Sequence, residues 1–135
     1  QFSISNFQMH SVVRDELAKA GSELLIRIIP DYTAGKIELG PQDEIEATFT
    51  KMLTRDDGKV DLQNDSPQDI YNKFRAYEGW PGIWTLHNDK RVKILDCKLI
   101  DSNLQILSVQ PEGKKPMQLK DFENGYGKIS TLSTL

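Results

Sequence analysis

The sequence predicts an α+β fold that is mostly β, in which an amphipathic helix and an extended linker precede a capped helix and a run of strands. Apolar residues recur at spacings of three and four before residue 30, which is typical of a helix. Segments rich in β-branched and aliphatic residues, separated by turn residues, fill positions 83 to 109. A chain of 135 residues with 38% hydrophobic content is enough for one domain with a core and a flanking segment.

The first predicted helix spans residues 11 to 29, and Pro30 is expected to end it. Its apolar stripe consists of Val13, Leu17, Ala20, Leu24 and Ile28, widened by Leu25 and Ile29. Gly21 lies inside the helix at a cost of about 1 kcal/mol relative to alanine, so we expect the helix to pack on a larger body. Residues 31 to 46 contain glycines, a proline and acidic residues without periodicity, which predicts an extended linker.

A second helix is specified by its start and end signals. Ser66 can cap it, Pro67 suits its first position, and Asp69 lies three residues after the cap as in a capping box. Gly79 is placed to end the helix in a left-handed turn. The residues expected on its buried face are Ile70, Phe74 and Tyr77.

Three strands are predicted after this helix, and together they imply a meander or a small barrel. They cover residues 83 to 86, 91 to 100 and 104 to 109, with turns at residues 87 to 89 and 101 to 103. Residues 119 to 126 are predicted to form a short closing helix, and the tail from Ile129 onward is predicted to be frayed.

The charge balance argues against a nucleic-acid binder that works by bulk positive charge, since the net charge is -3. Residues 83 to 120 nevertheless hold seven basic and four acidic side chains, a net charge of +3, while the remainder carries -6. This is the pattern expected if one face meets phosphate. The alternative, that these lysines only solvate strand edges, stays open on charge alone.

Arg91 and Lys93 share strand parity and therefore one face of the sheet, while the apolar residues between them face the other way. This separation favours a basic outer surface over an apolar core. Trp80 and Trp84 could stack on bases, although aromatic side chains beside a Pro-Gly turn more often fill a core.

The residues that could take part in catalysis or bind a metal ion have simpler structural interpretations. Cys97 could pair with His87, but its strand pattern favours a buried structural thiol. The acidic residues Asp56, Asp57, Asp61 and Asp65 could bind a cation, but their spacing does not match a calcium loop and turn carboxylates explain them more simply. We therefore predict no metal site. A single cysteine fits a reducing, cytoplasmic setting, and no apolar run is long enough to span a membrane.

Six short segments, in order along the chain, resemble the C-terminal domain of the methionyl-tRNA formyltransferase family. They are Ala47 to Lys51, Asp57 to Asp61, Phe74 to Ala76, Trp80 to Gly82, Gln110 to Met117 and Phe122 to Tyr126. The helix at residues 11 to 29 resembles the last helix of that family's catalytic domain. The predicted domains are therefore residues 1–41 for that helix and the linker, 42–126 for the C-terminal domain, and 127–135 for a flexible tail.

The resemblance implies an OB-like β-barrel that helps hold initiator methionyl-tRNA, while an upstream catalytic domain transfers formyl from 10-formyltetrahydrofolate. The barrel is expected to be abbreviated, because the connection at residues 101 to 103 is short. Leu62 also departs from the family, which usually has tryptophan there. The residues expected to contact tRNA phosphates are Lys90, Arg91, Lys93, Lys114 and Lys115.

The family's catalytic residues have no counterpart in this sequence, so we expect no catalytic residue, no bound cofactor and no activity of the chain alone. The expected partners are initiator methionyl-tRNA and the upstream catalytic domain, in translation initiation. The alternative is a structural or interaction domain of a formyltransferase that acts on another substrate, such as an amino sugar nucleotide.

Overall fold

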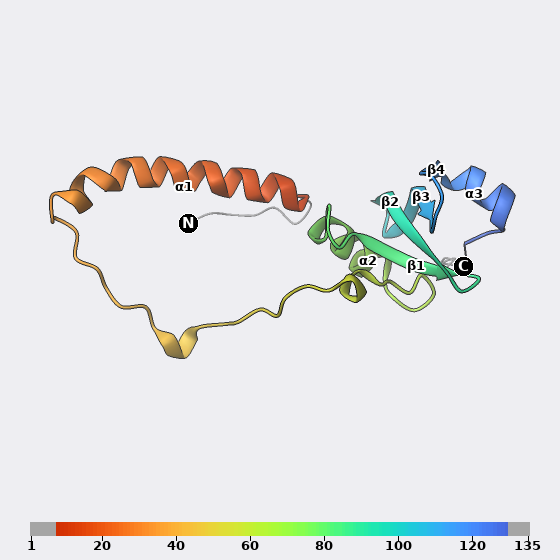
Figure 1. The fold of residues 1–135 in the computed structure, drawn as a ribbon, viewed down its shortest axis with the longest axis horizontal. Helices are drawn as coiled ribbons and strands as arrows, with labels where there is room; N and C mark the ends of the chain where they lie inside the picture. The colour runs from red at the N-terminus through yellow and green to blue at the C-terminus, as the bar shows by residue number, and fades with distance from the viewer. Residues whose placement is uncertain (1–7, 130–135) are drawn as a thin grey trace. The chain divides into compact units, whose positions relative to one another are not determined.

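The computed structural model describes residues 8–129 and divides the chain into two compact units, Gln1–Met52 and Leu53–Leu135. Figure 1 shows the helix α1 of the first unit and the sheet with two helices of the second. The boundary at residue 42 stays a prediction.

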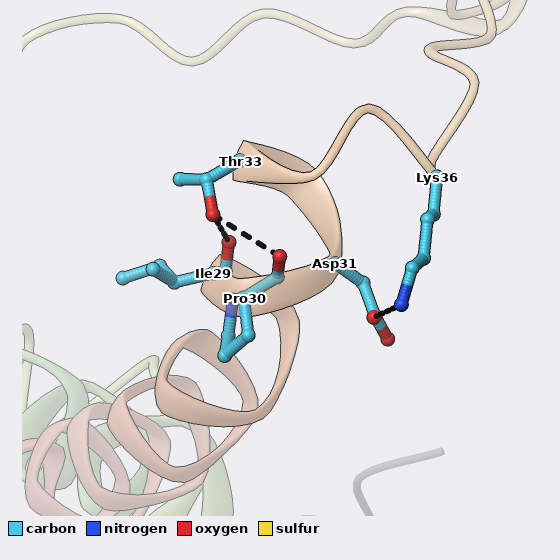
Figure 2. A network of polar contacts seen from close by, with 5 residues as sticks. All are labelled: Ile29, Pro30, Asp31, Thr33 and Lys36. Atoms are coloured by element: carbon cyan, nitrogen blue, oxygen red, sulfur yellow. Dashed lines mark hydrogen bonds and ion pairs between the residues drawn. The ribbon is translucent and has the colours of Figure 1, made fainter.

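The helix α1, His10–Thr33, is longer than predicted, because it does not end at Pro30. Proline has no N–H to donate to the carbonyl four residues earlier, so it costs one helical hydrogen bond. The turn that follows is held by other bonds. Ala34 N donates to Pro30 O at 3.1 Å, and Thr33 Oγ1 donates to the carbonyls of Ile29 and Pro30 at 2.9 and 3.1 Å. Figure 2 shows this hydroxyl between the two carbonyl groups.

No described residue of α1 is buried, and most of its large apolar side chains are exposed. These include Leu17, Leu24, Leu25, Ile26, Ile28 and Ile29. After α1, Lys36 forms an ion pair with Asp31 at 3.3 Å, and the chain continues without regular structure except for the short 3-10 helix η1, Glu44–Glu46. The predicted linker at residues 31 to 46 is confirmed in part, because residues 31 to 33 belong to α1 and residues 44 to 46 form η1.

The second unit begins with a 3-10 helix, η2, Arg55–Gly58, and continues into α2, Pro67–Ala76. The predicted cap of α2 is confirmed, because Ser66 Oγ accepts from Asp69 N at 3.1 Å and donates to Asp69 Oδ2 at 2.7 Å. Ile70 is buried, and Phe74 and Tyr77 pack against the core on the same face. Gly79 has a φ of 82°, as the left-handed turn requires.

Four antiparallel strands form one sheet in chain order: β1, Ile83–His87; β2, Lys90–Ile100; β3, Asn103–Pro111; and β4, Met117–Gln118. Positive φ angles at Asn88 and Asp89, and again at Asp101 and Ser102, make both hairpin turns the tight two-residue kind. The closing helix α3, Leu119–Tyr126, has the predicted bounds.

Two parts of the predicted fold class need correction. The three helices hold more residues than the four strands, because α1 alone has 24, so only the second unit is mostly β. The sheet is open rather than closed into a barrel, since β1 and β4 each pair with only one neighbouring strand. The two-residue turn at Asp101 and Ser102 leaves no chain between β2 and β3 for further strands.

Both helices of the second unit contribute to one core on a single face of the sheet. Ile70 of α2 and Phe122 of α3 belong to the same buried cluster as Val92, Ile94, Cys97, Ile106 and Val109 of the strands. Ile129 is also buried in this cluster, so the predicted frayed tail does not begin there. Residues 130 to 135 lie outside the described part of the chain.

Two of the short segments that carried the family resemblance meet in the structure. A Cβ placed on Gly58 would collide with the carbonyl oxygen of Gly82 and lie close to the ring of Pro81. Gly58 is therefore required for a close approach of two backbones, and its neighbours in sequence are held against the start of β1. Val60 N donates to Trp84 O at 2.9 Å, which continues this contact.

Candidate nucleic-acid interface

A basin of about 290 Å³ lies in the second unit beside β1, β2 and the end of β3. It is lined by Arg55, Trp80, Pro81, Trp84, Arg91, Lys93 and the segment Gln110 to Gly113. We call this hollow the basin. It brings together η2, the turn before β1, and the three longest strands.

Strand register explains why these side chains share the basin. Trp84 pairs with Lys93 across β1 and β2, and Lys93 pairs with Gln110 across β2 and β3, so the three side chains lie on one face. Arg91 shares their face because it lies two residues before Lys93. Glu112 N donates to Arg91 O at 2.9 Å, which holds the turn after β3 beside that residue.

Trp84 is buried beneath the basin and does not offer a free surface for stacking. Its side chain is 5% exposed, and its Nε1 donates to Arg55 O at 2.9 Å. The Arg91 guanidinium carbon lies 4.2 Å from the centroid of the Trp84 ring, a close cation–π contact. Lys59 Nζ lies 5.9 Å from the same ring. The interpretation of Trp84 as a core side chain is confirmed.

The cations of the basin have no carboxylate partner in the described part of the chain. Within residues 8–129, Arg55, Arg91 and Lys93 form no ion pair, and Arg91 Nε is buried without a hydrogen-bond partner. Glu112 is the one acidic residue of the lining. Three cations against one carboxylate in a concave surface favour an anionic ligand.

Trp80 differs from Trp84 in being 60% exposed at the basin. Among the described residues, its indole makes no hydrogen bond, aromatic contact or cation contact. It is therefore a large aromatic surface that the fold leaves available, and the interpretation of Trp80 as a core side chain is wrong.

The five predicted phosphate contacts do not form one cluster. Arg91 and Lys93 line the basin, while Lys90 and Lys114 line a second hollow of about 140 Å³ with His87, Phe122 and Tyr126. Lys115 is exposed in the loop between β3 and β4. Lys90 precedes Arg91 by one residue in β2 and so faces the other side of the sheet, while Pro111 and Glu112 line both hollows. Their contact with tRNA stays a prediction.

Sequence reasoning missed three members of the basin: Arg55, Gln110 and Glu112. Arg55 lies 29 residues before Trp84, and only the fold joins them. Gln110 could have been found from the sequence, because it continues the alternation of β3. Its partner across the strands, Lys93, lies on the predicted basic face. Its Nε2 donates to Lys114 O at 2.9 Å, which links the basin to the loop of the second hollow.

The acidic residues Asp57, Asp61 and Asp65 accept hydrogen bonds that stabilise turns and a helix cap. Asp57 Oδ2 accepts from Thr54 N and Oγ1 at 2.8 and 2.7 Å, and Asp65 Oδ2 accepts from Asp61 N at 2.9 Å. Hydrogen bonds from the Asn64 side chain and the Gln63 backbone lower the pKa of Asp61 below its ordinary value. In the described part of the chain no group of three His, Cys, Asp or Glu side chains is placed to hold a metal ion.

Cys97 is a structural thiol. It is 3% exposed, and burial, followed by the nearby Asp96 charge, raises its pKa to about 12. His87 is engaged elsewhere, because its Nε2 lies 2.8 Å from Tyr126 O. No helix within residues 8–129 is long and apolar enough to cross a membrane.

We expect Cys97 to resist thiol reagents in the folded chain below about pH 9 and to react once the chain is unfolded. Its neutral form is favoured by folding, so this contribution to stability is complete below the unfolded pKa and is lost as the pH rises from about 9 towards 12. Labelling with a chromogenic disulfide, with and without concentrated guanidinium chloride, measures both states. Equal labelling rates in the two would contradict a buried thiol.

Comparison with known proteins identifies the second unit. A family model described as formyl transferase, C-terminal domain, matches residues 52–105. A methionyl-tRNA formyltransferase of Sulfurihydrogenibium sp. (strain YO3AOP1) is 37% identical over 95 residues, which are 70% of this chain and 30% of that protein. The chain contains a formyltransferase C-terminal domain.

Other relatives of this formyltransferase domain extend the match. The methionyl-tRNA formyltransferase of Streptococcus thermophilus is 33% identical over 84% of this chain and 43% of its own length. That of Herpetosiphon aurantiacus is 32% identical over 87% of this chain and 46% of its own length. The chain therefore spans less than half the length of these curated relatives.

Solved structures share the fold of the chain. A crystal structure of HypX from Aquifex aeolicus matches 99% of this chain and 29% of that chain with a TM-score of 0.71. A second HypX structure covers 95% with a TM-score of 0.70. Sequence identity is 13% in both, so these matches concern the fold alone.

Proposed function

We propose that this chain is the C-terminal part of a methionyl-tRNA formyltransferase and helps position initiator methionyl-tRNA for formylation by an upstream catalytic domain. The observation that carries the proposal is the group of three cations, Arg55, Arg91 and Lys93, which line one basin and have no carboxylate partner among residues 8–129. Arginine and lysine form charge-assisted hydrogen bonds with phosphate groups, and such contacts supply most of the affinity of proteins for nucleic acids. The curated relatives add the enzyme class.

In this proposal the chain contributes binding and no chemical step. The formyl group comes from 10-formyltetrahydrofolate, bound by the part of the enzyme that the matched region does not cover, and the reaction takes place in the cytoplasm. The exposed apolar stripe of α1 packs against that catalytic domain, because an uncovered stripe of this kind is unfavourable in water. The four-stranded meander is the retained part of an OB-like barrel.

The test is the salt dependence of tRNA binding by the 135-residue chain. Each phosphate contact contributes about 0.9 to the slope of log K against log salt for double helices. Lys93→Ala should reduce that slope by about 0.7 to 1, and the double variant Lys114→Ala with Lys115→Ala by up to about twice as much. Filter binding of initiator tRNA over a salt series measures it.

Lys98→Ala is the matched control, because Lys98 is an exposed lysine of the same strand β2 that lines neither hollow. Its slope should equal that of the parent chain. Absence of tRNA binding at low salt, or an equal loss for Lys98→Ala, would contradict the proposal. Failure to bind would leave the alternative, an interaction domain of a formyltransferase with another substrate.

A further inference from the structure

We propose that the basin holds one unpaired nucleotide of the bound RNA, with its base stacked on Trp80 and its phosphate among Arg55, Arg91 and Lys93. The inference rests on the proposed function and deepens it by naming the part of the RNA that this site takes. It assigns Trp80 as the residue that recognises a base, in addition to the cations that contact phosphate.

The first argument is that the indole of Trp80 is exposed at the basin, where it can stack on an aromatic ring of a ligand. Its side chain is 60% exposed, although a tryptophan buries a large area when it has a partner. The neighbouring Trp84 shows the contrast, since its N–H is bonded to Arg55 O and its ring lies under Arg91. Trp80 has none of these contacts within residues 8–129.

The second argument is the combination of this ring with unpaired cations. Proteins that bind single-stranded nucleic acid combine a positively charged groove for the backbone with aromatic side chains for the bases. The basin has both elements in about 290 Å³, because Trp80 lines it together with Arg55, Arg91 and Lys93. A volume near the lower end of small-ligand pockets, roughly 300 Å³, suits one nucleotide rather than a longer segment.

The third argument selects an unpaired base over a double helix. In a helix each base is stacked on both sides, so its faces are covered and only its edges are available. Trp80 offers a flat surface for stacking, and a stacked ligand must expose a face. A loop or the single-stranded end of an RNA meets this requirement.

The test compares an oligoadenylate, which has bases and phosphates, with inorganic polyphosphate, which has phosphates only. Oligoadenylate should quench the tryptophan fluorescence of the chain, and Trp80→Ala should weaken its binding about 5- to 150-fold, the range of one lost base stack. Trp80→Phe retains an aromatic ring and should restore most of the affinity. Polyphosphate binding should be the same for all three proteins.

Phe49→Ala is the matched control, because Phe49 is an aromatic side chain that is 92% exposed, lies in the segment without regular structure after η1, and does not line the basin. It should leave oligoadenylate binding unchanged. Trp80 is largely exposed, so we expect Trp80→Ala to fold, and circular dichroism of the variant measures this directly. An RNA duplex without unpaired nucleotides should not distinguish Trp80→Ala from the parent chain.

The outcomes separate this inference from the proposed function. If tRNA binds with the expected salt dependence while Trp80→Ala binds oligoadenylate as tightly as the parent, the stacking site is wrong and the basin binds phosphate alone. If tRNA does not bind at low salt, the proposed function is wrong whatever Trp80 does. Equal loss of oligoadenylate and polyphosphate binding in Trp80→Ala would also overturn the inference, because a base contact cannot affect a ligand without bases.

Discussion

Replacing Phe122 with alanine should lower the free energy of unfolding of the second unit by about 3 to 5 kcal/mol. Phe122 is 1% exposed and belongs to the core cluster that both helices share with the sheet. Its ring lies 4.9 Å from that of Tyr126 and 5.2 Å from that of His87, between centroids. Truncation leaves a cavity where α3 meets the sheet, and the surrounding strands can close it only in part.

Urea unfolding followed by tryptophan fluorescence measures this effect, because both tryptophans belong to the second unit. Phe49→Ala is again a suitable control, since it removes the same atoms from an exposed position and should change stability by less than about 0.5 kcal/mol. A comparable loss in the two variants would show that α3 does not close the core.

Replacing Gly58 with alanine should destabilise the second unit by about 2 to 3 kcal/mol, although it adds only one methyl group. The added Cβ would overlap the carbonyl oxygen of Gly82, and a backbone oxygen cannot rotate away as a flexible side chain can. The segments that contain Gly58 and Gly82 must then separate. Because Arg55 and Trp80 lie in those segments, RNA binding should weaken together with stability.

Gly125→Ala is the matched control for this substitution. Gly125 lies in α3, and a Cβ there would meet no atom within 4 Å. Alanine is the better helix former, so Gly125→Ala should raise stability by about 0.5 to 1 kcal/mol. Urea midpoints of the two variants that shift in the same direction would contradict the close contact of Gly58 with Gly82.

The sequence predicted local features well because their causes are local. The cap at Ser66, the two tight turns and the bounds of α3 each depend on residues within a few positions of one another. The predicted end of α1 at Pro30 is wrong, because hydrogen bonds of the Thr33 side chain and of the following backbone stabilise one more turn after the proline. Closure of the sheet depends on which distant strands pair, and no local pattern determines that.

The candidate site was predictable in part for the same reason. Strand alternation placed Arg91 and Lys93 on one face, as the basin confirms. The same alternation places Lys90, one residue before Arg91, on the opposite face with Val92, and both line the second hollow. It could not place Lys114, because the position of that lysine depends on the turn after β3 and on where α3 packs. Nor could it bring Arg55 to Trp84, or show that one tryptophan is covered and the other exposed.

The contact between Arg91 and Trp84 has a consequence for the thermodynamics of binding. An arginine side chain loses up to about 2 kcal/mol of rotamer freedom when a ligand immobilises it. The guanidinium of Arg91 already rests 4.2 Å from the Trp84 ring centroid, so folding has ordered it before any ligand arrives. Lys114 and Lys115 are exposed and must be ordered by the ligand itself. A phosphate held by Arg91 should therefore bind with a smaller entropic penalty than one held by either lysine.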